Sequence, residues 1–219
     1  MTGRYVALIP AYNPSPVLYN LVRDLCNAGF LIVIVNDGSN DSCSYIFDDC
    51  SIRATILHHP QNAGKGQAIK TGLQYIQSNF AQDTVIVTVD ANNSHTVQDA
   101  LSICAIAQQH SRALVLGCRC FDKDVQLRSR FRSKLAGLMF HRSTGLRLRD
   151  PQSGLRAFSF RQIPILSAIE GNRYDYEINV LLHCAQSKIR ILEHPLKSVY
   201  TDSPNASHFR AVKTALRKT

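Results

Sequence analysis

An acidic side chain and an amide side chain stand two residues apart at the end of a strongly apolar stretch. Residues 84–89 are rich in valine, threonine and isoleucine, and Asp90 and Asn92 follow closely. The β-branched run predicts a strand buried on both faces, and ligands of open α/β sheets bind beyond the carboxyl ends of strands. Oxygen atoms there can hold a divalent cation and, through it, a diphosphate. The alternative is that Asp90 and Asn92 merely cap the next helix.

Two more polar turns follow predicted strands. Residues 4–10 and 30–36 are apolar runs; Tyr12 lies two residues after the first, and Asp37 comes directly after the second. A carboxylate after the second strand suits an amide N–H of a nucleobase or a ribose hydroxyl. Because right-handed crossovers return a parallel chain to the same side, we expect all three turns at one edge of the sheet.

A lysine between two glycines is the third chemical feature. Lys65 lies between Gly64 and Gly66, where the small neighbours would let it approach a phosphate or a base closely. A plain helix start is the alternative. No GxGxxG follows the first strand and no GxxxxGK[ST] loop occurs, which argues against the usual dinucleotide and P-loop sites.

Strands and helices alternate regularly around these turns. The expected strands are residues 4–10, 30–36, 54–58, 84–89 and 113–118, and the expected helices are about 17–28, 42–50, 62–79 and 97–110. This alternation predicts an α/β fold with a mostly parallel central sheet flanked by helices. With 219 residues and no linker, the chain should form one domain, residues 1–219.

Composition narrows the class of protein. No apolar run approaches 18 residues and no leader-like segment precedes the first strand, so we expect no transmembrane segment and a cytoplasmic location. The seven cysteines form no CxxC pair, which favours core thiols over a metal or disulfide role.

The net charge of +9 suggests an anionic partner. Basic residues gather in one segment: Lys123, Arg128, Arg130, Arg132, Lys134, Arg142, Arg147 and Arg149. That segment lacks interleaved exposed aromatic residues and matches no known module, which argues against nucleic acid. We therefore expect a nucleotide-sugar-binding half at about 1–120 and a basic, acceptor-binding half at about 121–219.

Seven motifs in order carry a resemblance to a known family. They are residues 9–13, 35–41, 62–66, 90–92, 117–119, 150–158 and 174–177. The first four resemble motifs of family 2 glycosyltransferases with the GT-A (Rossmann-like) fold. The last three resemble the branch that includes the dolichyl-phosphate or polyprenyl-phosphate mannose and glucose synthases.

The resemblance implies an inverting transfer of a sugar from a UDP- or GDP-linked donor to a polyprenyl or dolichyl phosphate, with Mg²⁺ or Mn²⁺ as cofactor. It assigns catalysis to Asp90, Arg119 and Arg132, and the acceptor phosphate to Arg119 with Arg130 or Arg132. The donor residues it implies are Pro10, Tyr12, Asp37, Lys65, Asp90, Ala91 and Asn92. The metal ligands it implies are Asp90, Asn92 and Gln152, with His208 as a further candidate.

One departure from the family keeps other interpretations open. Asn92 stands where the family usually has a second acid, so the metal site could be weaker and the protein could bind nucleotide-sugars with little catalysis. Alternatively, the acceptor could be a polysaccharide or another hydroxyl, with Asp175 or Glu177 as general base. A lipid acceptor would bring the enzyme to the cytoplasmic face of a membrane as a peripheral protein, helped by a basic tail too short to anchor stably.

Overall fold

A seven-stranded sheet forms the centre of the computed structural model, which describes residues 5–92, 94–119, 141–142 and 144–196. Its strand order is β3-β2-β1-β4-β6-β5-β7. The strands are β1 (Tyr5–Ala11), β2 (Leu31–Asn36), β3 (Thr55–His58), β4 (Val85–Thr88), β5 (Leu114–Arg119), β6 (Arg156–Ser159) and β7 (Ile191–Leu196). The first five match the strands predicted from the sequence, so that prediction is confirmed.

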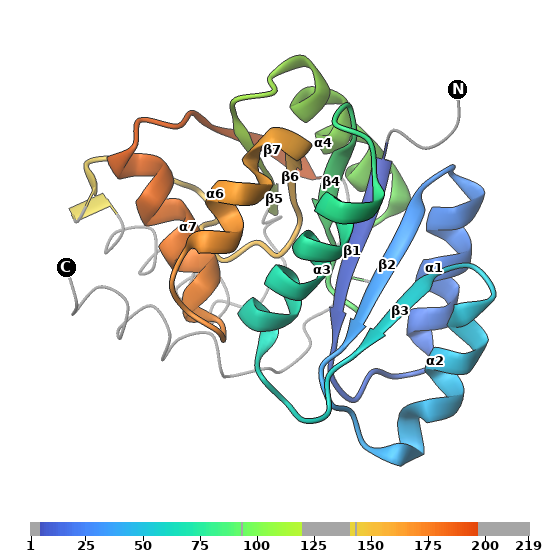
Figure 1. Ribbon diagram of the computed structural model, residues 1–219. Helices are drawn as coiled ribbons and strands as arrows, with labels where there is room; N and C mark the ends of the chain where they lie inside the picture. Colours follow the sequence, from blue (N-terminus) through green and yellow to red (C-terminus); the bar gives the residue numbers. More distant parts are fainter. Residues whose placement is uncertain (1–4, 93, 120–140, 143, 197–219) are drawn as a thin grey trace, which may run out of the picture.

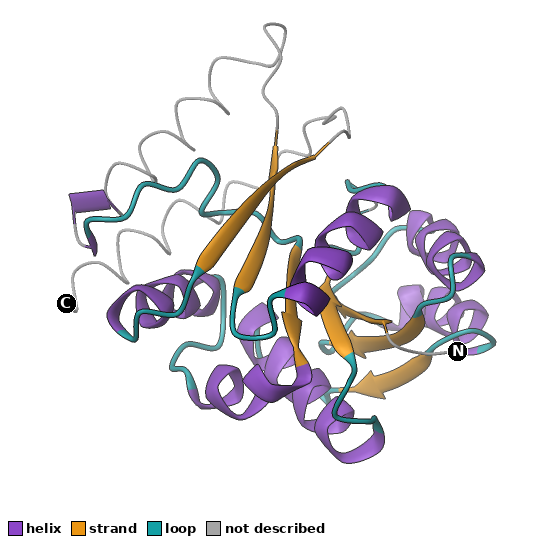
Figure 2. Ribbon diagram, turned by 90° about the horizontal axis from the view of Figure 1, so that it is seen from above, coloured by secondary structure: helices purple, strands orange, loops and turns teal. Residues whose placement is uncertain are grey.

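Helices cover both faces of the sheet (Figures 1 and 2). The α-helices are α1 (Val17–Asn27), α2 (Ser44–Ser51), α3 (Lys65–Asn79), α4 (Val97–Gln109), α6 (Ile163–Ala168) and α7 (Asp175–Gln186). Short 3₁₀ turns, η1 (Asp41–Cys43) and η2 (Phe160–Gln162), precede α2 and α6. No helix in these described ranges combines the length and apolar character needed to cross a bilayer.

The alternation of side chains along each strand divides the core into two layers. In β1, Val6 and Leu8 join the apolar cluster under α3, α6 and α7, whereas Ala7 and Ile9 join the cluster under α1, α2 and α4. All four side chains are fully buried. Strands buried on both faces need continuous apolar runs, which explains the sequence pattern of β1 and β2.

One strand runs against the others. β6 lies antiparallel between β4 and β5, with Ile86 opposite Phe158 and Val115 opposite Ala157. The pairs β1–β2, β1–β4, β2–β3 and β5–β7 are parallel, which confirms a mostly parallel sheet. Since β6 reverses direction between them, β4 and β5 still point the same way and end at the same edge.

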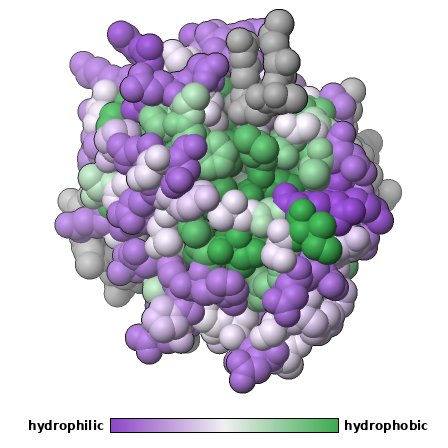
Figure 3. All heavy atoms as spheres, turned by 45° about the vertical axis from the view of Figure 1, so that its right-hand side comes forward, coloured by the Kyte–Doolittle hydropathy of each residue, from purple (hydrophilic) through white to green (hydrophobic). Residues whose placement is uncertain are grey.

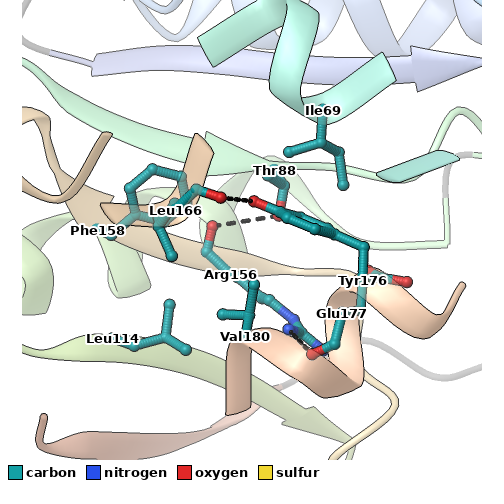
Figure 4. A pocket seen from close by; sticks show the side chains of 9 residues that line it. All are labelled: Ile69, Thr88, Leu114, Arg156, Phe158, Leu166, Tyr176, Glu177 and Val180. Carbon is teal, nitrogen blue, oxygen red and sulfur yellow. Dashed lines mark hydrogen bonds between the residues drawn. The ribbon is translucent and has the colours of Figure 1, made fainter. Parts of the chain in front are cut away.

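A small apolar cavity of about 20 Å³ lies between the sheet and helices α3, α6 and α7 (Figure 4). Thr88 and Tyr176, two of the polar residues on its wall, are already paired. The Thr88 hydroxyl donates to the Gly154 carbonyl at 2.8 Å, and the Tyr176 hydroxyl donates to the Leu166 carbonyl at 2.9 Å. An apolar gap whose polar neighbours are satisfied is a packing space and not a ligand site.

Candidate active site

The ends of β1, β2 and β4 meet at one edge of the sheet, the lower edge in Figure 1. The Asp37 amide donates to the Ala11 carbonyl at 2.8 Å, and the Val89 amide donates to the Leu8 carbonyl at 3.0 Å. These bonds continue the parallel pairing past the strands and bring the polar turns together. The expectation of a shared edge is therefore confirmed.

An ion-pair cluster marks this edge. The Lys65 ammonium, on the first residue of α3, lies 2.7 Å from Asp90 Oδ1 and 3.0 Å from Glu177 Oε1. The Lys65 side chain is 14% exposed, Glu177 is 6% exposed and Asp90 is 26% exposed. One cation is thus shared by two carboxylates, of which only Asp90 has substantial access to solvent.

The electrostatics of the cluster keep Lys65 positively charged. Burial alone would lower the pKa of the Lys65 ammonium, but the nearby charges of Asp90 and Glu177 outweigh it and raise the pKa above its ordinary value. The Tyr174 ring adds a further contact, with its centroid 5.9 Å from the ammonium nitrogen. A fixed positive charge is therefore available at the strand ends throughout the physiological pH range.

Close packing between α3 and the start of α7 explains the glycines around Lys65. A Cβ on Gly66 would lie 2.5 Å from Tyr176 Cβ, and Gly64 has φ +102° with the Asn172 carbonyl against it. The Gln67 amide donates to that same carbonyl at 2.9 Å. The glycines allow the segment before α7 to lie on the first turn of α3, which brings Glu177 to Lys65.

The loop between residues 150 and 154 forms the wall behind Asp90. A Cβ on Gly154 would collide with both carboxylate oxygens of Asp90, so only glycine fits there without a shift. Gln152, half-buried in the same loop, lies two residues from this contact. The structure thus places this predicted metal ligand in the loop that contacts the Asp90 carboxylate, and its ligand role stays a prediction.

Arg156 holds the loop in place, a role that the sequence reasoning missed. Its buried guanidinium donates to three carbonyls: Ser153 at 2.9 Å, Glu177 at 2.7 Å and Pro151 at 3.2 Å. These bonds tie the loop behind Asp90 to the first turn of α7. The signal was its place in motif 150–158, but a single arginine in a motif does not reveal that its partners are backbone atoms.

Asp37 is 2% exposed and anchors the loop that leads into α3. Its Oδ1 accepts from the Ala63 amide at 2.9 Å and lies 2.7 Å from His59 Nδ1, and its Oδ2 accepts from the Gly64 amide at 2.8 Å. Both oxygens are therefore engaged with the chain just before Lys65. The assignment of Asp37 to the base or ribose stays a prediction.

Tyr12 stands at the same edge with 52% of its surface exposed, one residue past the strand that contains Pro10. The turn behind it is locked, because the Asn13 amide donates to Ser39 Oγ at 2.9 Å and Asn13 Oδ1 accepts from the Asn40 amide at 2.8 Å. An exposed aromatic ring on a fixed turn can stack on a nucleobase.

The interpretation of Asp90 and Asn92 as helix caps is wrong. Helix α4 is capped by Thr96, whose hydroxyl accepts from the Asp99 amide at 3.1 Å in a full capping box. Asn92 is exposed, and its Oδ1 accepts from the Ser94 amide at 3.2 Å, which closes its own turn beside half-buried Ala91. Asp90 instead takes part in the ion-pair cluster.

The residues at this edge fit a divalent cation bound mainly by substrate. Within the described ranges no group of three histidine, cysteine or acidic side chains is arranged to hold a metal. Asp90 offers one accessible carboxylate, and Mg²⁺ in proteins is often held by one or two carboxylates together with waters and substrate phosphates.

Four predicted residues remain, and only Arg119 is among the described residues. Arg119 ends β5, where its backbone pairs with Leu196. Because β4 and β5 both run antiparallel to β6, this end of β5 lies at the same edge as Asp90. Arg130, Arg132 and His208 lie outside the described residues, so their roles stay predictions.

The three-layer architecture, with polar turns gathered at the strand ends, is a GT-A fold. Solved structures agree on the fold. Glucosyl-3-phosphoglycerate synthase from Mycobacterium tuberculosis, in complex with phosphoglyceric acid, superposes with a TM-score of 0.74 at 17% identity, over 98% of this chain and 79% of that one. The same enzyme with Mn²⁺, UDP and glucosyl-3-phosphoglycerate gives a TM-score of 0.72 at 15% identity, over 97% and 77% of the two chains.

The sequence profile of Glycosyl transferase family 2 matches residues 6–166, and the chain belongs to that family. A relative from Methanococcus voltae, named UDP-N-acetylglucosamine–dolichyl-phosphate N-acetylglucosaminyltransferase, is 28% identical over 216 residues, covering 89% of this chain and 85% of that protein. The dolichyl-phosphate beta-glucosyltransferase ALG5D of Trichomonas vaginalis is 24% identical over 210 residues, covering 85% and 63%.

Proposed function

We propose that this glycosyltransferase moves a sugar from a UDP-linked donor to a polyprenyl-type lipid phosphate, with inversion at the sugar C1. The observation that carries the proposal is the pairing of Lys65 and Asp90 at the edge where β1, β2 and β4 end. A fixed ammonium and an accessible carboxylate are the two groups that a donor diphosphate and its cation need.

The relatives support the choice of substrates. Proteins with dolichyl phosphate in their names match this chain along most of its length, and one of them is named for a UDP-linked donor. One of the solved neighbours holds UDP together with Mn²⁺. A GDP-linked donor is the alternative that a donor screen would reveal.

The reaction needs alignment more than proton transfer. A phosphate oxygen of the acceptor attacks C1 while the bond from C1 to the diphosphate oxygen breaks and its electron pair leaves with the diphosphate. The acceptor is already an anion, so no general base is required. Lys65 lies where it can neutralise the departing diphosphate, and a divalent cation held by Asp90 would supply further charge neutralisation.

The carboxylates considered as general bases have other partners. Glu177 is buried and paired with Lys65, and Asp175 Oδ1 accepts from the Arg173 amide at 2.9 Å. This arrangement favours an anionic acceptor over a hydroxyl one. Arg119 ends at the same edge because β5 runs parallel to β4, and a planar guanidinium suits the phosphate of such an acceptor.

Replacing Asp90 tests the site. In Asp90→Ala we expect transfer from UDP-sugars to a short polyprenyl phosphate to fall at least about 100-fold, since neutralising a leaving group is worth several kcal/mol. Circular dichroism should show an unchanged fold. Asp48→Ala removes an exposed acid on α2 and should leave activity unaltered. Near-normal transfer by Asp90→Ala would contradict the proposed site.

Replacing Arg119 tests the acceptor. We expect Arg119→Ala to lower transfer far more than hydrolysis of the donor, because water needs no phosphate clamp. Arg119→Lys should restore little, since a point charge lacks the two parallel hydrogen bonds of the guanidinium. Arg112→Ala, an exposed residue just before β5, is the matched control. An equal fall of both activities in Arg119→Ala would assign Arg119 to the donor, and transfer only to hydroxyl acceptors would change the acceptor class.

A further inference from the structure

Asp90 already has a cation on it. Its Oδ1 lies 2.7 Å from the Lys65 ammonium, the distance of a direct, charge-assisted hydrogen bond. Under the proposed function, the same carboxylate is the one that holds the divalent cation. The Lys65 ammonium and the divalent cation would therefore compete for the same accessible carboxylate.

The residues around Asp90 add little negative charge that would favour binding of a divalent cation over the ammonium. Asn92 carries no charge, and its oxygen closes a turn with the Ser94 amide. Lys65, Asp90 and Glu177 together carry a single negative charge. A site with so little negative charge should attract a divalent cation only weakly while the ammonium stays on Asp90.

We infer that Lys65 is a built-in competitor of the divalent cation for Asp90, and that Glu177 is a positioning residue that keeps the ammonium in the site when Asp90 releases it. This inference rests on the proposed function of Asp90. It explains why one nitrogen contacts two carboxylates of such different exposure.

The burial of Glu177 supports its role as the second partner. Its side chain is 6% exposed and its Oε1 lies 3.0 Å from the Lys65 nitrogen. A buried carboxylate without a cation is costly, so the pair with Lys65 persists when Asp90 takes another cation. The ammonium then stays close to Asp90, where the donor diphosphate would meet both positive charges.

A charge-conserving double variant isolates the competition. Lys65→Met together with Glu177→Gln removes one charge of each sign, so the net charge of the site is unchanged. It also replaces a buried ion pair by neutral side chains of similar size, which leaves no stranded charge to prevent folding. The matched control is Lys70→Met together with Asp175→Asn, which removes the same charges from the same two helices without touching Asp90.

Two binding measurements on the full chain should move in opposite directions. Mn²⁺ titrated without nucleotide and followed by electron paramagnetic resonance should bind the Lys65→Met, Glu177→Gln variant about tenfold tighter than the natural chain, as expected on removing a partly buried competing charge. UDP titrated without metal and followed by calorimetry should bind the same variant about tenfold more weakly, because its diphosphate loses a charged donor. The control variant should match the natural chain in both measurements.

Each other outcome decides against the inference. Unchanged Mn²⁺ affinity, or no measurable Mn²⁺ binding by any of the proteins, would show that Lys65 does not compete. Weaker Mn²⁺ binding would make Glu177 itself a ligand, and an equal gain in the control variant would make the effect a general one. Asp90→Asn separates this failure from that of the proposed function, because Mn²⁺ binding that survives Asp90→Asn would remove Asp90 from the metal site altogether.

Discussion

At the scale of single residues, the site consists of charged side chains whose partners come from distant parts of the chain. Lys65 pairs with Asp90 and also with Glu177, which lies 112 positions further along the chain than Lys65. Asp37 joins β2 to the loop before α3 in the same manner. Residues that look like independent ligands in the sequence therefore also organise the backbone around them.

Asp37 should affect both stability and nucleotide binding. Asp37→Ala leaves the Ala63 and Gly64 amides and His59 without their acceptor, so we expect the free energy of unfolding in urea to fall by about 1–3 kcal/mol. Nucleotide affinity measured by calorimetry should fall as well, because the loop before Lys65 loosens. Asp48→Ala, which is exposed, should change neither. Lower stability with unaltered nucleotide affinity would limit Asp37 to a purely structural role.

At the scale of elements, the contact between α3 and the start of α7 positions the cluster. α3 supplies Lys65 and α7 supplies Glu177, and both helices pack on the same face of the sheet. Neither helix alone supplies both charges at the strand ends. The glycine at position 66 is what allows them to approach.

Two glycines of α3 offer a direct comparison. Alanine favours a helix over glycine by up to about 1 kcal/mol. A Cβ on Gly66, however, would meet Tyr176 Cβ and the Arg173 carbonyl, whereas the atoms nearest to a Cβ on Gly72 belong to the Leu8 side chain. We expect both alanine variants to lose stability through overpacking, by about 1–3 kcal/mol. Only Gly66→Ala should also weaken nucleotide binding and transfer, because it displaces α7 from Lys65. Normal activity in Gly66→Ala would show that this contact does not position the site.

At the scale of the whole molecule, hydrophilic side chains lie at the surface and most of the described cysteines lie in the core. On the face shown in Figure 3, hydrophilic side chains form most of the outline and apolar ones gather in the middle. The chain carries a net charge of +9, which suits an anionic partner whose attraction would weaken at high salt. Four of the described cysteines are buried instead: Cys50, Cys104, Cys118 and Cys184.

The buried thiols predict loss of stability in alkali. Burial raises the pKa of Cys50 and of Cys184 from about 9 to about 11, with Asp49 adding to the effect at Cys50, and burial also raises the pKa of Cys104 and Cys118. Between about pH 9 and 11 the unfolded chain loses these protons while the folded chain keeps them, so stability falls as the pH rises.

Urea midpoints measured from pH 8 to 11 should therefore decline. In the native protein at pH 8, a thiol reagent should label Cys26 and Cys43, which are half-buried, well before the four buried thiols. Equal labelling rates for all of these thiols would contradict the burial. Flat urea midpoints would contradict the raised pKa values.

The sequence alone determined the alternation of strands and helices up to residue 119 and the edge at which the polar turns meet. Both follow from local patterns, because apolar runs and turn residues leave direct periodic signals and parallel crossovers have a fixed hand. The sequence likewise singled out Asp90, Lys65 and Asp37 by their places after strands or between glycines. The motifs in order were enough to indicate the family.

Only the tertiary structure decided what these residues contact. β6 has four residues and is defined by its pairing with β4 and β5, a non-local event that leaves no local pattern. The role of Glu177 as the partner of Lys65, the three carbonyls on Arg156 and the fit of Gly154 against Asp90 all depend on segments that meet through folding. The structure likewise showed that Thr96, and not Asp90, caps helix α4. Side-chain partners distant in sequence are decided by packing, and packing is a property of the folded chain.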